Sequence, residues 1–354
     1  MNAQFTRHEL IFKQASGTSR GVLTTKETYL LEISKNGQKG IGECAIFRGL
    51  SYDDVPDYEE KLTWLCENIH SDFEVLKKEL LHYPSIIFGL EQALLNLEHG
   101  EDLYFPSDFT DGKDSIKING LIWMGNADFM QSQIEEKLAK GFDCIKLKIG
   151  VDWKSEKEII KKLREKFPKE QLELRVDANG AFSYEEATIV LQELADLGIH
   201  SIEQPIKKSQ VKTKKSQETD EINSTDYCVP WNEMAKLCAE TPTPIALDEE
   251  LIGVIDFEEK KKLLETIKPQ YIILKPALVG GFSGSDEWIA IAESLGINWW
   301  ITSALESNIG LNAICQYTYT KKNPLPQGLG TGALFTNNFE THLQLEGDQM
   351  WHKK

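Results

Sequence analysis

The chain has 354 residues, of which 41% are hydrophobic and 27% are charged, a composition typical of a globular protein long enough for two domains. Its formal net charge of −17 argues against nucleic acid or an anionic membrane as a partner. The first residues lack a basic stretch followed by a long apolar run, and no run of about 20 apolar residues is present, so we expect neither a signal peptide nor a membrane span. The six cysteines are scattered without a C-x-x-C pair, which favours free thiols in the cytoplasm over structural zinc.

Residues 1–112 are expected to form a separate α+β domain. The stretch "YLLEISKNGQKGIGECA" (29–45) predicts a β-hairpin that turns at Asn36 and Gly37. Residues 58–70 and 85–100 both carry helical periodicity. We expect Ser85 to be the N-cap of the second helix and Gly100 to end it. Strands followed by helices are typical of an α+β unit.

Residues 113–333 alternate between β-rich runs and helical stretches, which predicts an α/β fold, a (β/α) barrel of the TIM type. An eighth run is rich in glycine and less regular. One polar segment, 207–227, interrupts the pattern and is expected to be an insertion in a loop. The predicted strands lie at 116–122, 144–150, 173–179, 200–206, 244–250, 271–277, 297–304 and 326–336.

Charged residues recur where these strands end. Lys148, Asp177, Glu203, Asp248 and Lys275 follow one another at about one βα period once the insertion is subtracted. The carboxyl ends of barrel strands carry the chemistry of such folds. Three carboxylates on consecutive strands would repel one another, so we expect a cation between them.

Oxygen ligands favour Mg²⁺, and Mn²⁺ fits the same ligands. None of these strand ends carries a histidine, which argues against zinc. We therefore predict a metal site made by Asp177, Glu203 and Asp248.

Two lysines share one face of a strand in "CIKLKIG". Lys146 and Lys148 are two residues apart, so their side chains point the same way. A lysine must be partly neutral to act as a base, and we expect a nearby like charge and a low-dielectric site to lower the pKa of Lys148. A base beside a metal-bound carboxylate could remove an acidic α-proton from a substrate.

The motifs "KLKIG", "RVDANGAF", "SIEQPI", "IALDEEL" and "IILKPALVGG" resemble the muconate-lactonising subgroup of the enolase superfamily. Within it, "GIGECAIFRGLS", "WWITSALESNIGLNA" and "PQGLGTG" are most similar to the o-succinylbenzoate synthases of menaquinone biosynthesis. The resemblance implies a capping domain, a catalytic barrel, and a C-terminal tail, 334–354, that returns to the cap.

That family dehydrates 2-succinyl-6-hydroxy-2,4-cyclohexadiene-1-carboxylate to 2-succinylbenzoate by α-proton abstraction and enediolate stabilisation. The resemblance implies that Lys148 moves the proton and that Lys275 stabilises charge from the opposite side. Lys146 matches the first lysine of the pair. An N-acylamino acid racemase or a dipeptide epimerase of the same subgroup stays open as an alternative, although the eighth strand offers no acid to hold a dipeptide's ammonium group.

The site charge suits a small dicarboxylate substrate. Asn179 and Glu249 are expected to support the metal ligands. Ser303 and Ser307 are candidates for substrate contact, with helix capping as the alternative. Arg20 in a polar loop and the backbone at Gly328 are candidates for holding a substrate carboxylate. The sequence leaves the oligomeric state open.

Overall fold

The computed structural model describes residues 1–18, 21–123, 127–209 and 231–353. The predicted substrate contact Arg20 and residues 210–227 of the predicted insertion lie outside these ranges. None of the helices in the described ranges combines the length and the apolar character that crossing a bilayer requires.

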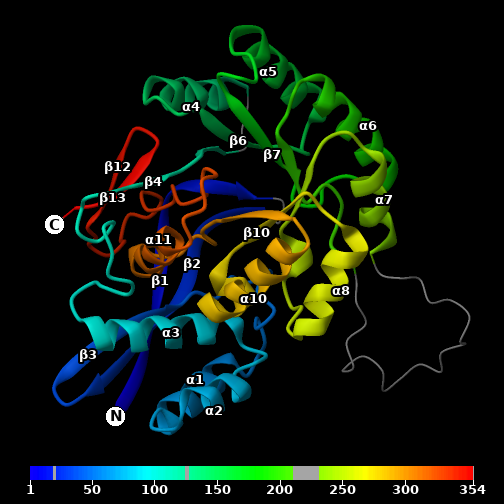
Figure 1. Ribbon diagram of the computed structural model, residues 1–354. Coiled ribbons are helices and arrows are strands. Elements are labelled where there is room, and N and C mark those ends of the chain that lie inside the picture. Colours follow the sequence, from blue (N-terminus) through cyan, green and yellow to red (C-terminus); the bar gives the residue numbers. More distant parts are fainter. Residues whose placement is uncertain (19–20, 124–126, 210–230, 354) are drawn as a thin grey trace, which may run out of the picture.

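The N-terminal part is an antiparallel sheet covered by helices, which lies on one side of the molecule in Figure 1. The predicted hairpin is confirmed, because β2 and β3 pair in register and Asn36 and Gly37 both have positive φ, 52° and 81°. Apolar side chains alternate along β2 and are buried against the helices. The elements are β1 (Asn2–Thr18), β2 (Gly21–Lys35), β3 (Gln38–Cys44), α1 (Tyr58–Asn68), α2 (Phe73–Glu79) and α3 (Pro84–His99).

Helix α3 lies unusually close to β3. A Cβ added to Gly42 would lie 2.0 Å from the carbonyl oxygen of Gly89, so neither strand nor helix could approach this closely with larger residues. The predicted cap at Ser85 is wrong, since α3 already begins at Pro84. The Ser85 amide and hydroxyl instead donate to Oδ2 of Asp53, at 2.9 and 2.6 Å, so a carboxylate from a distant loop satisfies the start of this helix.

The second part is a parallel sheet whose strands follow one another in chain order, as the barrel prediction requires. In the described ranges seven strands pair in the order β11-β10-β9-β8-β7-β6-β5. Single bridges from Thr302 to Gly328 and from Ile118 to Gln327 then join its two edges through the glycine-rich eighth run. The strands are β5 (Gly120–Ile122), β6 (Cys144–Lys148), β7 (Glu173–Asp177), β8 (Ser201–Glu203), β9 (Ile245–Leu247), β10 (Tyr271–Leu274) and β11 (Asn298–Ile301).

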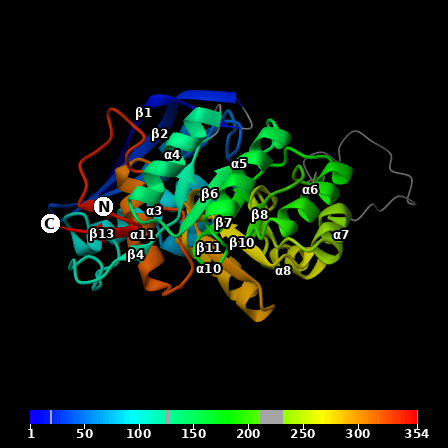
Figure 2. The same cartoon turned by 90° about the horizontal axis from the view of Figure 1, so that it is seen from above.

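Helices surround these strands and cover their outer faces (Figures 1 and 2). Helix α5, for example, buries an apolar stripe formed by Ile159, Ile160 and Leu163. The helices are α4 (Ala127–Ala139), α5 (Trp153–Lys166), α6 (Tyr184–Asp196), α7 (Asn232–Glu240), α8 (Phe257–Ile267), α9 (Pro276–Val279), α10 (Gly281–Ser294) and α11 (Asn308–Thr320), with one 3₁₀ turn at Glu249–Leu251.

The C-terminal residues contact both parts. Phe12 in β1 bridges to Phe335, and the hairpin of β12 (Leu343–Glu346) and β13 (Gln349–His352) pairs with β4 (Ile116–Lys117). The hairpin is visible beside β4 in Figure 1. His342 Nδ1 and His352 Nε2 lie 2.6 and 3.0 Å from Oδ2 of Asp102, which ties the tail to the segment after α3. The domain boundaries at 112 and 333 stay a prediction.

Candidate active site

Strand β6 presents Lys146 and Lys148 on the face that its neighbours leave for the barrel interior. The intervening Leu147 and the flanking Ile145 are buried on the opposite face, in the hydrophobic core. Lys148 pairs in register with Asp177 on β7, which in turn pairs with Glu203 on β8. Parallel register therefore brings together groups that are 29 and 26 residues apart in the sequence.

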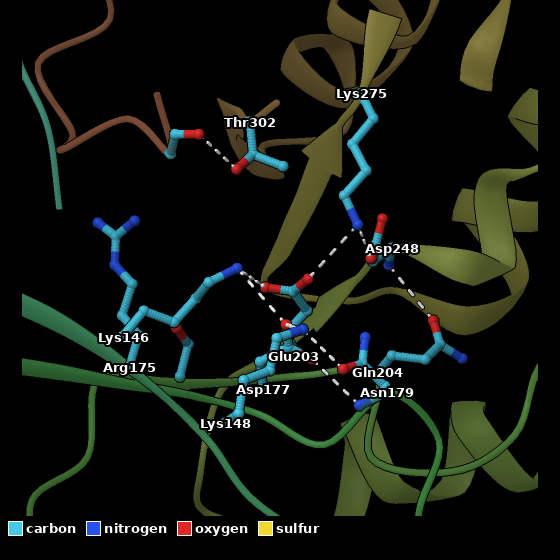
Figure 3. A network of polar contacts seen from close by, with 12 residues as sticks. Lys146, Lys148, Arg175, Asp177, Asn179, Glu203, Gln204, Asp248, Lys275 and Thr302 are labelled. Atoms are coloured by element: carbon cyan, nitrogen blue, oxygen red, sulfur yellow. Dashed lines mark hydrogen bonds and ion pairs between the residues drawn. The ribbon is translucent and has the colours of Figure 1, made fainter. Parts of the chain in front are cut away.

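The three predicted acidic ligands lie at the carboxyl ends of consecutive strands and are almost fully buried, with at most 2% of each residue exposed. Asp177 and Glu203 are the last residues of β7 and β8, and Asp248 directly follows β9. Figure 3 shows their side chains converging on the same region as the three lysines.

Each carboxylate contacts a different lysine. Lys148 Nζ lies 2.5 Å from Oδ2 of Asp177, and Lys146 Nζ lies 2.7 Å from Oε2 of Glu203 and 3.5 Å from Asp177. Lys275 donates to Asp248 and lies 3.9 Å from Oε1 of Glu203. The five groups of the predicted lysine–acid–acid–acid–lysine series, together with Lys146, therefore form one connected network.

Burial and neighbouring charges act in opposite directions on these groups. Burial raises the pKa of the Glu203 carboxyl, and the adjacent Asp177 carboxylate adds to this, giving a pKa of about 8. Burial also raises the pKa of Asp248. Burial alone would raise the pKa of Asp177 as well, but Lys148 and Lys146 outweigh it and hold that pKa well below its ordinary value. The lysines therefore compensate Asp177 fully, whereas the charges of Glu203 and Asp248 are compensated less.

The residues present fit a divalent cation. Oε1 of Glu203 is buried and accepts no hydrogen bond from the described residues, so it is available to a positive ion. The donors at the three strand ends are all carboxylate oxygens, the ligand type that Mg²⁺ and Mn²⁺ prefer. Burial first, and then the neighbouring Asp177 and Asp248 carboxylates, raise the pKa of Glu203, and a bound cation would offset both effects.

Asn179 links Lys148 to Glu249. Its Oδ1 accepts from Lys148 Nζ at 2.6 Å, and its Nδ2 donates to Oε1 of Glu249 at 3.0 Å. The backbone of Asn179 has a positive φ of 45°, which asparagine tolerates better than most residues. The structure therefore places both predicted supporting residues beside the network.

Gln204 was not singled out from the sequence, yet it holds the loop that carries Asp248. Its Oε1 accepts from the amides of Asp248 and Glu250, at 3.3 and 3.1 Å. Gln204 is fully buried with a positive φ of 41°. In the sequence, only its position directly after the predicted ligand Glu203 indicated that Gln204 could lie at the site.

Arg175 of β7 lies beneath the site and is 1% exposed. Its guanidinium carbon is 4.2 Å from the centre of the Trp300 ring, and Nη1 donates to the carbonyl of Pro326 at 2.9 Å. Arg175 therefore fills the barrel interior and ties β7 to the eighth run, and Figure 3 shows it beside Lys146.

A cavity opens above the network. Ser303 and Gly328 line it, whereas Ser307 does not. Ser307 is fully buried, its hydroxyl donates to Oε2 of Glu43 at 2.5 Å, and it caps α11, which is the alternative that the sequence left open. The lining residues are Phe47, Leu50, Asn119, Leu121, Trp123, Lys146, Lys148, Asp177, Asn179, Glu249, Lys275, Thr302, Ser303, Ala304, Leu305, Gly328, Gly330 and Thr331.

Glu43 is a second residue that the sequence did not reveal. This fully buried carboxylate from β3 accepts hydrogen bonds from Thr28 Oγ1 and from the Ser307 and Gly310 amides, at 2.8, 3.0 and 2.9 Å, besides the Ser307 hydroxyl. It thereby joins the N-terminal sheet to the start of α11, where a negative charge is stabilised by the helix dipole. This contact ties the end of β3, shortly before the cavity-lining Phe47 and Leu50, to the barrel.

Comparison with known proteins agrees with this architecture. Residues 130–222 and 228–349 match the family described as "Enolase C-terminal domain-like", and residues 2–97 match "MenC, N-terminal domain". The chain is 42% identical to the o-succinylbenzoate synthase of Desulfotalea psychrophila, over 98% of each chain. It is 33% identical to an N-succinylamino acid racemase of Thermus thermophilus, covering 85% of this chain and 78% of that protein.

Solved structures show the same fold. The crystal structure of MenC from Desulfotalea psychrophila superposes with a TM-score of 0.84 at 40% identity, over 99% of both chains. The muconate lactonizing enzyme from Pseudomonas putida superposes with a TM-score of 0.74 at 20% identity, covering 99% of this chain and 93% of that one. The chain belongs to the enolase superfamily and, within it, to the family of the o-succinylbenzoate synthases.

Proposed function

We propose that this chain is a lyase, an o-succinylbenzoate synthase, that dehydrates 2-succinyl-6-hydroxy-2,4-cyclohexadiene-1-carboxylate to 2-succinylbenzoate for menaquinone biosynthesis. The observation that carries this proposal is the 42% identity to an o-succinylbenzoate synthase over nearly the whole length of both chains. The buried network of three lysines and three carboxylates supplies the groups that such a reaction needs.

Lys148 is proposed to move the proton. Its Nζ borders the cavity, and in its neutral form it would take the proton from the carbon that bears the ring carboxylate. The same ammonium would then protonate the departing hydroxyl, so that one C–H bond and one C–O bond break, a ring C=C bond forms, and water leaves. The contacts to Asp177 and Asn179 hold Nζ in place for both transfers.

Lys275 and Lys146 are proposed to act by their charge. Carboxylates outweigh burial at both lysines, mainly Asp248 for Lys275 and Glu203 for Lys146, and hold each pKa above its ordinary value, so both ammonium groups stay charged. A fixed positive charge stabilises the negative charge that develops on the substrate carboxylate when its α-proton is lost.

Asp177, Glu203 and Asp248 are proposed to hold Mg²⁺, with Mn²⁺ as a substitute, and Asn179 and Glu249 to support them. A divalent cation at this place would supply a Lewis acid for the substrate carboxylate. The backbone at Gly328 is proposed to receive the second carboxylate, since Gly328 lines the cavity and a Cβ there would lie 1.8 Å from Oγ1 of Thr302. The net charge of −17 suits a cytoplasmic enzyme that handles small molecules.

A second candidate is racemisation of N-succinylamino acids. The 33% identity to an N-succinylamino acid racemase favours it over dipeptide epimerisation, for which the solved relatives are 18–20% identical. Lys148 and Lys275, on opposite sides of the acids, would act on the two faces of the substrate, one as the base and the other, in its charged form, as the acid. This activity would use the same cavity and the same metal ligands.

The deciding experiment is a turnover assay with the cyclohexadiene substrate, with Mg²⁺ and with the metal removed by a chelator. We expect turnover only with the metal. Absence of turnover with Mg²⁺ would overturn the proposal. Racemisation of N-succinylamino acids with α-proton exchange, measured in parallel in deuterated water, would then support the second candidate.

A further inference from the structure

One buried cation of the N-terminal sheet has no partner in the network described so far. Lys26 lies on β2, opposite Leu10 of β1, and is 6% exposed. Its Nζ is buried and makes no hydrogen bond with any described residue. A buried ammonium is costly unless opposite charges compensate it. The acidic groups that act on its charge are Glu43 and Glu306, and Thr28, two residues further along the same face of β2, donates to Glu43.

These two carboxylates differ in how far they are already used. Glu43 accepts four hydrogen bonds, from Thr28, Ser307 and Gly310, as described above. Glu306 is fully buried, and its Oε1 has no hydrogen-bond partner in the described part of the chain. Lys26 Nζ and Glu306 Oε1 are thus two buried groups of opposite charge that have no hydrogen-bond partner in the described part of the chain. Burial raises the pKa of Glu306, and the charge of Lys26 opposes that rise.

The other oxygen of Glu306 shapes the wall of the cavity. Its Oε2 accepts from the Ser303 hydroxyl at 2.5 Å and from the Ala304 amide at 2.7 Å. The same Ser303 hydroxyl accepts from Thr331 Oγ1 at 2.8 Å and from the Leu305 amide at 3.0 Å. Leu305 has a positive φ of 63°, a conformation that the loop must hold against its steric cost.

The ionisation of Glu306 therefore decides where the Ser303 hydroxyl points. An ionised Glu306 can only accept, so the proton of Ser303 is directed away from the cavity. A protonated Glu306 could donate instead, which would free the Ser303 hydroxyl to turn toward the ligand and would loosen the amides of Ala304 and Leu305.

We infer that Lys26 is a positioning residue that keeps Glu306 ionised and thereby fixes the Ser303–Leu305 wall of the cavity for substrate binding. Lys26 does not line the cavity, so it acts through Glu306 and not on the substrate. The inference deepens the proposed function, on which its kinetic part rests. It assigns the shape of one substrate-binding wall to a charge in the N-terminal sheet.

The test is a double-mutant cycle with Lys26→Met and Glu306→Gln, measured as KM and kcat for dehydration. We expect Lys26→Met to raise KM about tenfold or more and to change kcat much less. Without the charge of Lys26, Glu306 is a buried carboxylate without a compensating cation, and the Ser303–Leu305 wall that it holds should bind the substrate less tightly. In the Glu306→Gln background the additional effect of Lys26→Met should nearly vanish. Lys39→Met, at an exposed lysine of the same sheet, is the matched control and should leave both constants unchanged.

A full additional effect of Lys26→Met in the Glu306→Gln background would overturn the inference, since Lys26 would then act by another route. Lys26→Arg keeps the positive charge, so its KM should lie close to that of the wild type and well below that of Lys26→Met. Hydrogen exchange at the Ala304 and Leu305 amides gives a readout that needs no turnover; it should speed up in Lys26→Met, and unchanged exchange in a folded variant would contradict the inference. If the wild type fails to dehydrate the substrate, the proposed function fails, while faster exchange still supports the link from Lys26 to the wall.

Discussion

Replacement of Lys148 by alanine tests the proton transfer. In the structure Nζ of Lys148 borders the cavity and is held by Asp177 and Asn179 at 2.5 and 2.6 Å. A positioned acid or base contributes about 10²- to 10⁴-fold to a rate, and Lys148 is assigned both the removal and the return of a proton. We therefore expect Lys148→Ala to lower kcat by at least about 10⁴-fold.

The control separates proton transfer from charge. Lys148→Arg keeps the positive charge beside Asp177 but cannot lose its proton near neutral pH, so it should be nearly as inactive as the alanine variant. The assay is substrate consumption with Mg²⁺, together with calorimetric titration of Mg²⁺ into each variant. Metal affinity should persist, because Lys148 supplies none of the acidic ligands. Turnover within tenfold of the wild type in either variant would refute the assignment.

Three further predictions concern individual carboxylates. Because the pKa of Glu203 is about 8, Mg²⁺ binding at pH 7 should release close to one proton, and apparent affinity should rise with pH until about 8; calorimetry in buffers of different ionisation enthalpy measures this, and no proton release would contradict it. Glu43→Ala should lower the free energy of unfolding by at least about 3 kcal/mol in urea titrations, since several buried donors lose a charged acceptor. Glu32→Ala, at a partly exposed carboxylate of the same sheet, is the control and should change it by less than about 1 kcal/mol. Burial alone would raise the pKa of Asp102, but hydrogen bonds from two histidines outweigh it and hold that pKa below its ordinary value. The stability that this carboxylate contributes is therefore present above about pH 4 and is lost progressively as the pH falls below that value. The melting temperature of Asp102→Asn should be lower than that of the wild type at pH 7 and approach it toward pH 3, and a difference that stays constant with pH would contradict this.

The fold was predictable because periodicity and strand-end chemistry repeat along the chain. Seven of the eight expected strands form a parallel sheet in chain order, and the hairpin at Asn36 and Gly37 forms as its turn residues predict. The eighth run joins the barrel only through single bridges at Gln327 and Gly328, since its glycines give little strand propensity. The predicted cap at Ser85 failed because Asp53, 32 residues earlier, supplies the acceptor.

Only part of the candidate site could be predicted from the sequence. Parallel register places residues one βα period apart beside one another, so Lys148, Asp177 and Glu203 could be grouped from their spacing. The link from Glu43 to α11 could not, because Ser307 lies 264 residues away on another element, and sequence spacing carries no information about such contacts. Ser307 looked like a substrate contact from its strand-end position, yet its hydroxyl is used by Glu43.

The most direct measurement is a crystal structure of the protein with Mg²⁺ and the product 2-succinylbenzoate. The account predicts one ion bound by oxygens of Asp177, Glu203 and Asp248 at about 2.1 Å, with the ring carboxylate beside it and Nζ of Lys148 facing the ring. An ion held elsewhere, or those three side chains directed to separate places with magnesium bound, would contradict it.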